Sequence, residues 1–209
     1  MSRSPRCAVA AGILLVVTLL AGCAPKKSFP DKRYYVLDAS RPRGASSPTK
    51  DAVLSVRRLR VSPRYERKGL VYRTGELNYE SDFYNEFLIS PSAILTQEVR
   101  QWMEASHLFQ NVVASASHMA VSYILEGNVT ALYGDYRDTG SPKAVLAIQF
   151  FLISDISVET EVAFQRDYRE EVPLKATSSE ALVDGWNEAL GQILAALEQD
   201  LREVSLSSG

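Results

Sequence analysis

The ten residues Ala144–Ile153 read AVLAIQFFLI and are apolar at every position except Gln149. A strand that faces water on one side alternates apolar and polar residues, whereas a strand covered on both faces reads as a continuous apolar run. We therefore expect this stretch to be a central strand of a sheet, with other parts of the chain packed on both of its faces.

The segments on either side of this run carry the alternating pattern of strands with one apolar face. Upstream, apolar residues recur at every second position over residues Val121–Tyr133. Downstream, Val162, Phe164 and Tyr168 are interspersed with charged and polar residues. Because the connections between the three segments are short, we expect an antiparallel meander.

Two amphipathic helices are predicted, one in each half of the chain. The first opens with Ser90 as its N-cap and Pro91 at its first helical position. The second follows Thr177–Glu180, which fits a capping box. The apolar stripes are Leu95, Val99, Trp102 and Met103 in the first helix, and Leu182, Trp186, Leu190, Ile193, Leu197 and Leu201 in the second. The fold class is therefore α+β, with two helices packed on a mainly antiparallel sheet of about five to seven strands.

The first half of the chain supplies the shorter strands. We expect strands at Arg33–Asp38 and Ala52–Val61, and a hairpin in which Leu70–Arg73 and Glu76–Tyr79 flank the turn Thr74-Gly75.

The loop between the second of these strands and the hairpin is rich in tyrosine and arginine, the residues over-represented at interaction hot spots. The candidate partner-binding residues of this loop and the following strand are Arg64, Tyr65, Arg67, Tyr72 and Arg73. An ordinary loop followed by a strand packed in the sheet accounts for the same pattern equally well.

The N-terminus has the organisation of a secretory leader. Arg3 and Arg6 precede the apolar run Ala8–Leu20, which is shorter than the roughly 17–25 residues that span a bilayer. The run ends in Leu20-Ala21-Gly22-Cys23, which resembles the lipobox of bacterial lipoproteins. The resemblance implies cleavage before Cys23, attachment of diacylglycerol to its sulfur, and acylation of its new amine by a fatty acid such as palmitate.

Cleavage at this point defines three regions: a signal peptide over 1–22, a lipidated tether over 23–32 and a folded domain over 33–205. Loss of Arg3 and Arg6 leaves 21 Lys and Arg against 25 Asp and Glu, so the formal charge changes from −2 to −4. Cys23 becomes the only cysteine, and we expect no disulfide within the chain.

The sequence carries no recognisable catalytic or cofactor-binding motif. It has two histidines, His107 and His118, and neither lies near a nucleophile elbow or in a spacing suited to zinc. Asp135 and Asp138 flank a glycine-containing loop, but the pattern lacks the ligand count of a calcium site and is typical of turn chemistry. We expect no enzyme activity, cofactor or metal, and the absence of long Lys/Arg stretches argues against nucleic-acid binding.

Several segments taken in order resemble the family of ABC-type transport auxiliary lipoproteins, the PqiC/YmbA-like family. After the lipobox come Tyr34–Leu37, the long strand Val53–Val61 and Pro63–Tyr65. The remaining segments are Gly69–Arg73, Gly75–Leu77, Tyr84–Phe87, His107–Val112, the Ala144–Asp155 strand, the Phe164 strand and the final helix. Phe87 departs from the pattern, because the family often has tryptophan there.

This resemblance implies a role in lipid transport. Such lipoproteins are partners of MCE-domain proteins and of the permease and ATPase of an inner-membrane ABC transporter. The implied role is a docking subunit, anchored in the outer membrane through Cys23 and facing the periplasm. Ala24 favours the outer membrane, because Asp at that position commonly signals retention in the inner membrane.

Three other functions fit parts of the sequence. A lipid-binding periplasmic chaperone would need an apolar cavity, whereas the large apolar residues already have places in the predicted core. An outer-membrane assembly lipoprotein and a periplasmic hydrolase are the other two. A homo-oligomer that caps an MCE assembly is compatible with the sequence, which gives no sign of one.

Overall fold

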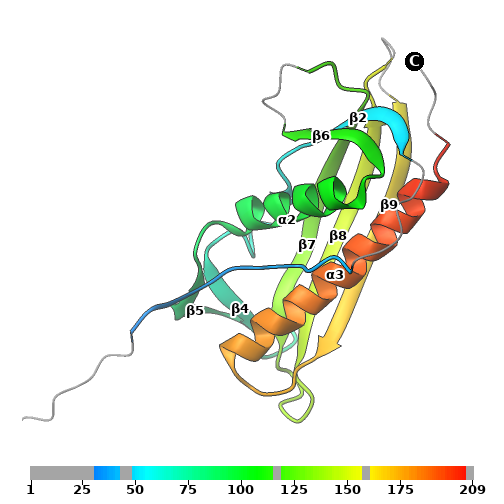
Figure 1. Cartoon of the computed structure of the whole chain (residues 1–209). Helices are drawn as coiled ribbons and strands as arrows, with labels where there is room; N and C mark the ends of the chain where they lie inside the picture. The colour runs from blue at the N-terminus through cyan, green and yellow to red at the C-terminus, as the bar shows by residue number, and fades with distance from the viewer. Residues whose placement is uncertain (1–30, 43–48, 115–118, 157–160, 206–209) are drawn as a thin grey trace, which may run out of the picture. The chain divides into compact units, whose positions relative to one another are not determined.

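The expected three-stranded meander is present and forms one side of the sheet, with its last strand at the edge. β8 (Lys143–Ser154) pairs antiparallel with β7 (Tyr123–Asp135) on one side and with β9 (Glu161–Pro173) on the other, along its whole length. This computed structural model describes residues 31–42, 49–114, 119–156 and 161–205 (Figure 1). The predicted signal peptide, Cys23, most of the tether and His118 lie outside these ranges.

The free edge of β7 receives three short strands that follow one another along it. β2 (Lys50–Val56), β3 (Arg60–Val61) and β4 (Gly69–Arg73) all pair with β7 in parallel. β7 is long enough to pair with β2 at its beginning, β3 in its middle and β4 at its end. The predicted single strand Ala52–Val61 is therefore two strands, β2 and β3.

Three further strands extend this edge. β6 (Phe109–Ala114) pairs with β2 in parallel, β5 (Tyr79–Phe87) forms the antiparallel hairpin with β4, and β1 (Arg33–Tyr35) pairs with β5 in parallel. The sheet thus has nine strands among the described residues, more than the expected five to seven. The longest pairings are antiparallel, so the expected α+β class with a mainly antiparallel sheet is confirmed.

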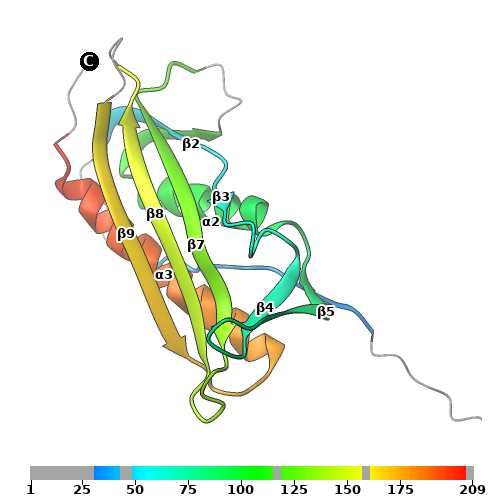
Figure 2. The ribbon, with the colours of Figure 1, turned by 180° about the vertical axis from the view of Figure 1, so that it is seen from behind.

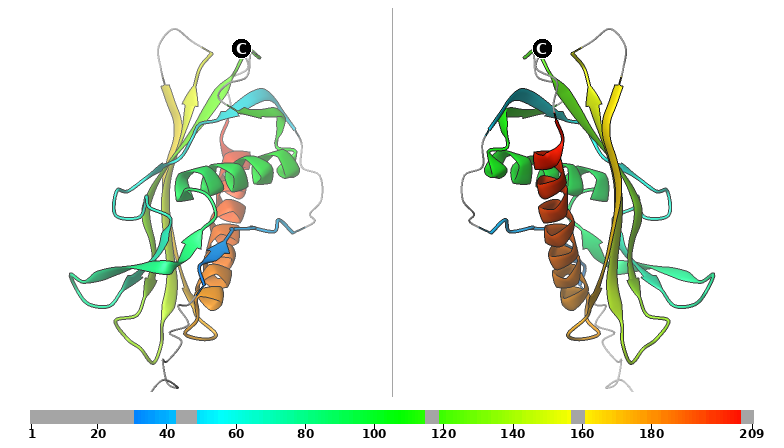
Figure 3. Two further views of the ribbon diagram at one scale, coloured as in Figure 1. Left: turned by 90° about the vertical axis from the view of Figure 1, so that its left-hand side faces the viewer. Right: turned by 90° about the vertical axis from the view of Figure 1, so that its right-hand side faces the viewer.

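Both helices lie on one face of the sheet (Figures 1 and 3). α3 (Ser179–Glu203) packs along β8 and β9, and α2 (Pro91–Ser106) packs near β2, β3 and β6. All the residues predicted for the two apolar stripes are buried, which confirms the helical spacing. The Trp186 indole packs 5.6 Å from the Phe87 ring, and its Nε1 donates to the Val145 carbonyl at 3.2 Å.

The helix starts are set by serine caps. Ser90 caps α2 and Pro91 follows it, as predicted. Ser178, and not Thr177, caps α3, because the Ser178 Oγ accepts from the backbone N–H of Ala181 at 3.2 Å. The predicted capping box therefore began one residue too early.

The opposite face of β7–β9 carries no helix from the described part of the chain (Figure 2). Val145 and Ala147 are buried on this face, but Gln149, Phe151 and Ile153 are only half-buried. The Ala144–Ile153 strand was predicted to be covered on both faces. On the face away from the helices, this holds for the first half of the strand and not for the second.

A β-bulge at the start of β9 changes the expected alternation there. The register between β8 and β9 shifts between Leu152 and Ile153, so Phe164 pairs with Leu152 while Val162 pairs with Ile153. Phe164 consequently lies on the helix-covered face, and the Val162 side chain is exposed.

The chain after β1 is fastened to both helices by buried carboxylates. Ala39 N–H donates to Glu98 Oε2 on α2 at 2.8 Å, and Arg41 binds Glu198 on α3 with two hydrogen bonds of 2.8 and 2.7 Å. Trp102 Nε1 on α2 also donates to Glu198 Oε2, at 2.8 Å. Glu198 therefore joins three segments that are far apart in the sequence.

Candidate partner-binding surface

The five predicted partner-binding residues lie in one part of the fold but not in one kind of environment. Arg64, Tyr65 and Arg67 are in the connection between β3 and β4, and Tyr72 and Arg73 are the last residues of β4. Arg64 and Arg67 are exposed, Tyr72 and Arg73 are half-buried, and Tyr65 is buried.

Tyr65 belongs to a cluster of three tyrosines. Its ring stacks on Tyr133 with 5.9 Å between centroids and meets Tyr79 edge-on at 6.4 Å, and Tyr79 meets Tyr133 edge-on at 5.7 Å. Burial raises the pKa of the Tyr65 hydroxyl to about 12. Such ring pairs add roughly 0.5–1.5 kcal/mol each beyond their area burial, so Tyr65 holds its loop onto the sheet.

The side chains of Tyr72 and Arg73 make contacts within the domain. The Tyr72 hydroxyl donates to Asp82 Oδ2 at 2.9 Å and lies 3.2 Å from the Ser179 hydroxyl at the start of α3. Arg73 Nη2 donates to the Glu76 carbonyl at 2.9 Å, which closes the β4–β5 turn. Through these contacts, both residues stabilise the fold of the domain.

Arg64 and Arg67 are the members of the set that face solvent. Neither forms a salt bridge with another described residue. Lys68 follows them and is also exposed, so the loop that Tyr65 holds in place presents three cationic side chains.

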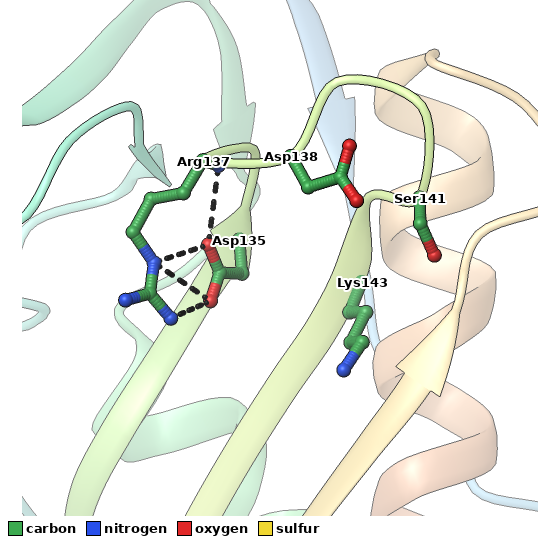
Figure 4. A pocket seen from close by; sticks show the side chains of 5 residues that line it. All are labelled: Asp135, Arg137, Asp138, Ser141 and Lys143. Atoms are coloured by element: carbon green, nitrogen blue, oxygen red, sulfur yellow. Dashed lines mark hydrogen bonds and ion pairs between the residues drawn. The ribbon is translucent and has the colours of Figure 1, made fainter.

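A polar hollow of about 370 Å³ lies at the end of the β7–β8 hairpin (Figure 4). Arg137 Nη2 contacts Asp135 Oδ2 at 2.7 Å, and Arg137 Nη1 contacts Glu76 Oε1 at 2.9 Å. The hydrogen bonds from Arg137 lower the pKa of Asp135, which stays ionised and is a poor proton acceptor. Asp138 Oδ1 accepts from the Gly140 N–H at 3.0 Å, which is the turn chemistry expected from the sequence.

Sequence reasoning missed a second surface, made of exposed apolar residues on and beside β1 and β5. Its members are Tyr34, Val36, Phe83, Tyr84, Leu88 and Ile89, and we call it the β1–β5 patch. The alternation around β1 is the signal that could have revealed it: Leu37 is buried and Tyr35 is half-buried, so Tyr34 and Val36 point the other way.

None of the helices in the described ranges combines the length and the apolarity needed to cross a bilayer. Within the same ranges, no group of three or more histidine, cysteine or carboxylate side chains is arranged to hold a metal ion.

The fold is shared with solved structures of low sequence identity. Protein XCC0632 from Xanthomonas campestris, described by the family model DUF330, is similar with a TM-score of 0.71 and 17% identity, over 79% of this chain and 92% of that one. A structure known only as an uncharacterised protein has a TM-score of 0.64 and 17% identity, over 82% and 99% of the two chains. No curated protein matches the chain at a significant level.

These likenesses define the class of the protein as an α+β domain with two helices on one face of a sheet. At the level of sequence, the model of the family "ABC-type transport auxiliary lipoprotein component" matches residues 35–198. The chain belongs to this family, and the resemblance identified in its motifs is confirmed.

Proposed function

We propose that the protein is a lipid-anchored periplasmic subunit that docks onto an ABC transport system of the MCE type, which moves lipids between the inner and outer membranes. The observation that carries the proposal is the family match, which spans nearly all of the folded domain and describes an auxiliary lipoprotein of transport. The lipobox ending at Cys23 supplies the anchor, and Ala24 favours the outer membrane.

The described surface supports a docking role better than a catalytic one. The carboxylates of the polar hollow already take part in contacts within the domain: Asp135 pairs with Arg137, and Asp138 accepts a hydrogen bond from the Gly140 N–H. The exposed Arg64 and Arg67, on a loop fixed by a buried tyrosine, are instead suited to an acidic surface on a partner.

A lipid-binding chaperone is the second candidate function. A hollow of about 470 Å³ between α3 and the chain after β1 is the feature that favours it. Its lining includes Ser40, Pro42, Trp102, Gly191 and Ala195. Hollows of roughly 300–1,000 Å³ suit drug-sized ligands. A phospholipid with two long acyl chains would fill more space than this one offers, so we favour docking.

Purification from detergent extracts tests the docking proposal. The tagged lipoprotein should recover an MCE-domain protein, a permease and an ATPase, each identified by mass spectrometry. Charge reversal of both Arg64→Glu and Arg67→Glu should strongly reduce that recovery, whereas Lys175→Glu, at another exposed cation, should leave it unchanged. Recovery of none of these components by the unmodified protein would overturn the proposal.

A further inference from the structure

Exposed apolar side chains gather at one place in the domain. Ten large apolar residues are exposed among those the structure describes, and six of them form the β1–β5 patch. Scattered single residues of this kind are normal on a protein surface, whereas a contiguous group marks an interaction site.

Backbone pairing makes the patch contiguous. β1 runs parallel to β5, with Tyr34 opposite Glu86, and the Leu88 N–H donates to the Tyr35 carbonyl at 2.8 Å. On β5 itself, the Phe83 and Tyr84 rings meet edge-on with 5.2 Å between centroids. The residues of the patch therefore share the outer edge of the sheet, where β1 and β5 lie together (Figure 1).

Two lysines border the patch. Lys32 Nζ lies 4.4 Å from the centre of the Phe83 ring and pairs with Glu86 Oε1 at 2.8 Å. Lys68 Nζ donates to the Leu88 carbonyl at 2.8 Å and forms no salt bridge with another described residue. Aromatic rings, aliphatic side chains and lysines in this combination are the chemistry of a membrane–water interface, where the rings sit at headgroup level and lysines meet lipid phosphates.

The length of the tether places this surface close to the anchor. Eight residues lie between Cys23 and Lys32. The nine steps from one Cα atom to the next, at about 3.6 Å each when extended, reach at most roughly 32 Å. The patch begins two residues later, at Tyr34.

We propose that the β1–β5 patch is a membrane-contact surface, which lies in the headgroup region of the bilayer that holds the acyl chains. This inference rests on the proposed anchorage at Cys23. The anchor attaches the domain, and the patch fixes which side of the domain faces the lipid.

Fluorescence quenching in vesicles tests the contact. The processed, acylated protein carries an environment-sensitive probe at Val36→Cys or, as the control, at Val162→Cys, and is reconstituted into vesicles of phosphatidylethanolamine and phosphatidylglycerol that contain brominated lipid. The two valines are matched, since each is 53% exposed, and β9 begins at the far end of the sheet from β5 (Figure 1). We expect the Val36 probe to shift to the blue and lose most of its emission, while the Val162 probe does neither. Adding Phe83→Ser and Tyr84→Ser should restore the emission of the Val36 probe.

The outcomes separate the patch from the anchor. Protein that fails to float with the vesicles refutes the anchorage and, with it, the proposed contact. Protein that floats while neither probe is quenched refutes the patch and leaves the anchorage intact. A Val36 probe that is shielded from iodide in water but not quenched by brominated lipid also refutes the membrane contact, because protein then covers the patch. If dilution of the protein in the membrane removes the shielding, a second copy covers the patch. If dilution does not remove it, the tether covers the patch.

Discussion

Glu198 shows how one residue can hold this domain together. Its burial alone would raise the pKa of the carboxyl, but the hydrogen bonds from Arg41 and Trp102 outweigh that effect and lower it. The carboxylate is thus kept ionised between α2, α3 and the chain that follows β1. Arg202, one turn further along α3, also pairs with it.

Replacement of Glu198→Gln should destabilise the domain by about 3 kcal/mol at neutral pH, because it leaves the half-buried Arg41 guanidinium without its counter-charge. The pKa of Glu198 is depressed in the folded state, so its stabilisation is present above the unfolded pKa and is lost as the pH falls through the folded pKa. Urea unfolding at several pH values measures this. The variant should lack that part of the acid sensitivity, and Glu188→Gln, an exposed glutamate on the same helix, should retain it.

The core leaves no room for a larger side chain at Gly127. A Cβ there would lie 2.7 Å from Leu59 Cγ and 3.1 Å from Phe150 Cε1, both in the core. Gly127→Ala should therefore destabilise the fold by roughly 1–3 kcal/mol through overpacking. Gly191 on α3 has no atom within 4 Å of a Cβ, so Gly191→Ala should stabilise by about 0.5–1 kcal/mol. Thermal unfolding of the two variants compares them, and equal effects would contradict this account.

At the scale of elements, the sequence predicted most securely the segments whose partners are near in the chain. The β7–β9 meander and the two helices were predicted because their patterns are local: alternation, apolar stripes and caps. β1, β2 and β3 pair in parallel with strands far along the chain, and no turn or spacing in the sequence encodes that register.

The distinction between local patterns and long-range contacts also explains how far the candidate site could be predicted. Tyrosine is a residue type common at interaction sites, so Tyr65 was predicted to contact a partner. It is buried instead, because the fold brings Tyr133 of β7 against its ring. Exposure of Arg64 and Arg67 follows from their place on the loop and could be anticipated. The β1–β5 patch could not, because β1 and β5 are about fifty residues apart.

The cap of α3 gives a test at this scale. Ser178→Ala should destabilise the domain by about 1 kcal/mol, since its Oγ accepts the Ala181 N–H. Thr177→Ala is the matched control one residue earlier and should change the unfolding free energy little. Equal losses in chemical denaturation would mean that the capping box predicted from the sequence also contributes.

At the scale of the whole molecule, the proposed anchor and the domain would have separate tasks. The domain carries the sequence of a transport auxiliary family, whereas its attachment is proposed to depend on a single sulfur outside the described ranges. Two acyl chains hold a protein on a membrane stably, whereas one does so only marginally.

Replacement of Cys23→Ser should therefore release the protein into the soluble periplasmic fraction or stop its processing. Membrane fractionation and the apparent mass of the product measure the two results. Cys7→Ser, in the predicted leader, should be processed and anchored normally. A Cys23→Ser protein that is cleaved and remains with the membrane would contradict the proposed lipidation.

The way β1 and the residues after it are attached also has a mechanical consequence. If the anchor stays in the bilayer while a partner pulls on the domain, tension enters the fold at Lys32 and acts first on the three-residue pairing of β1 with β5. Further along the chain are the hydrogen bonds of Ala39 to Glu98 on α2 and of Arg41 to Glu198 on α3. We expect the hydrogen bonds between β1 and β5 to break first under tension. The ion pair between Arg41 and Glu198 should then hold the chain and keep the force from unfolding the core.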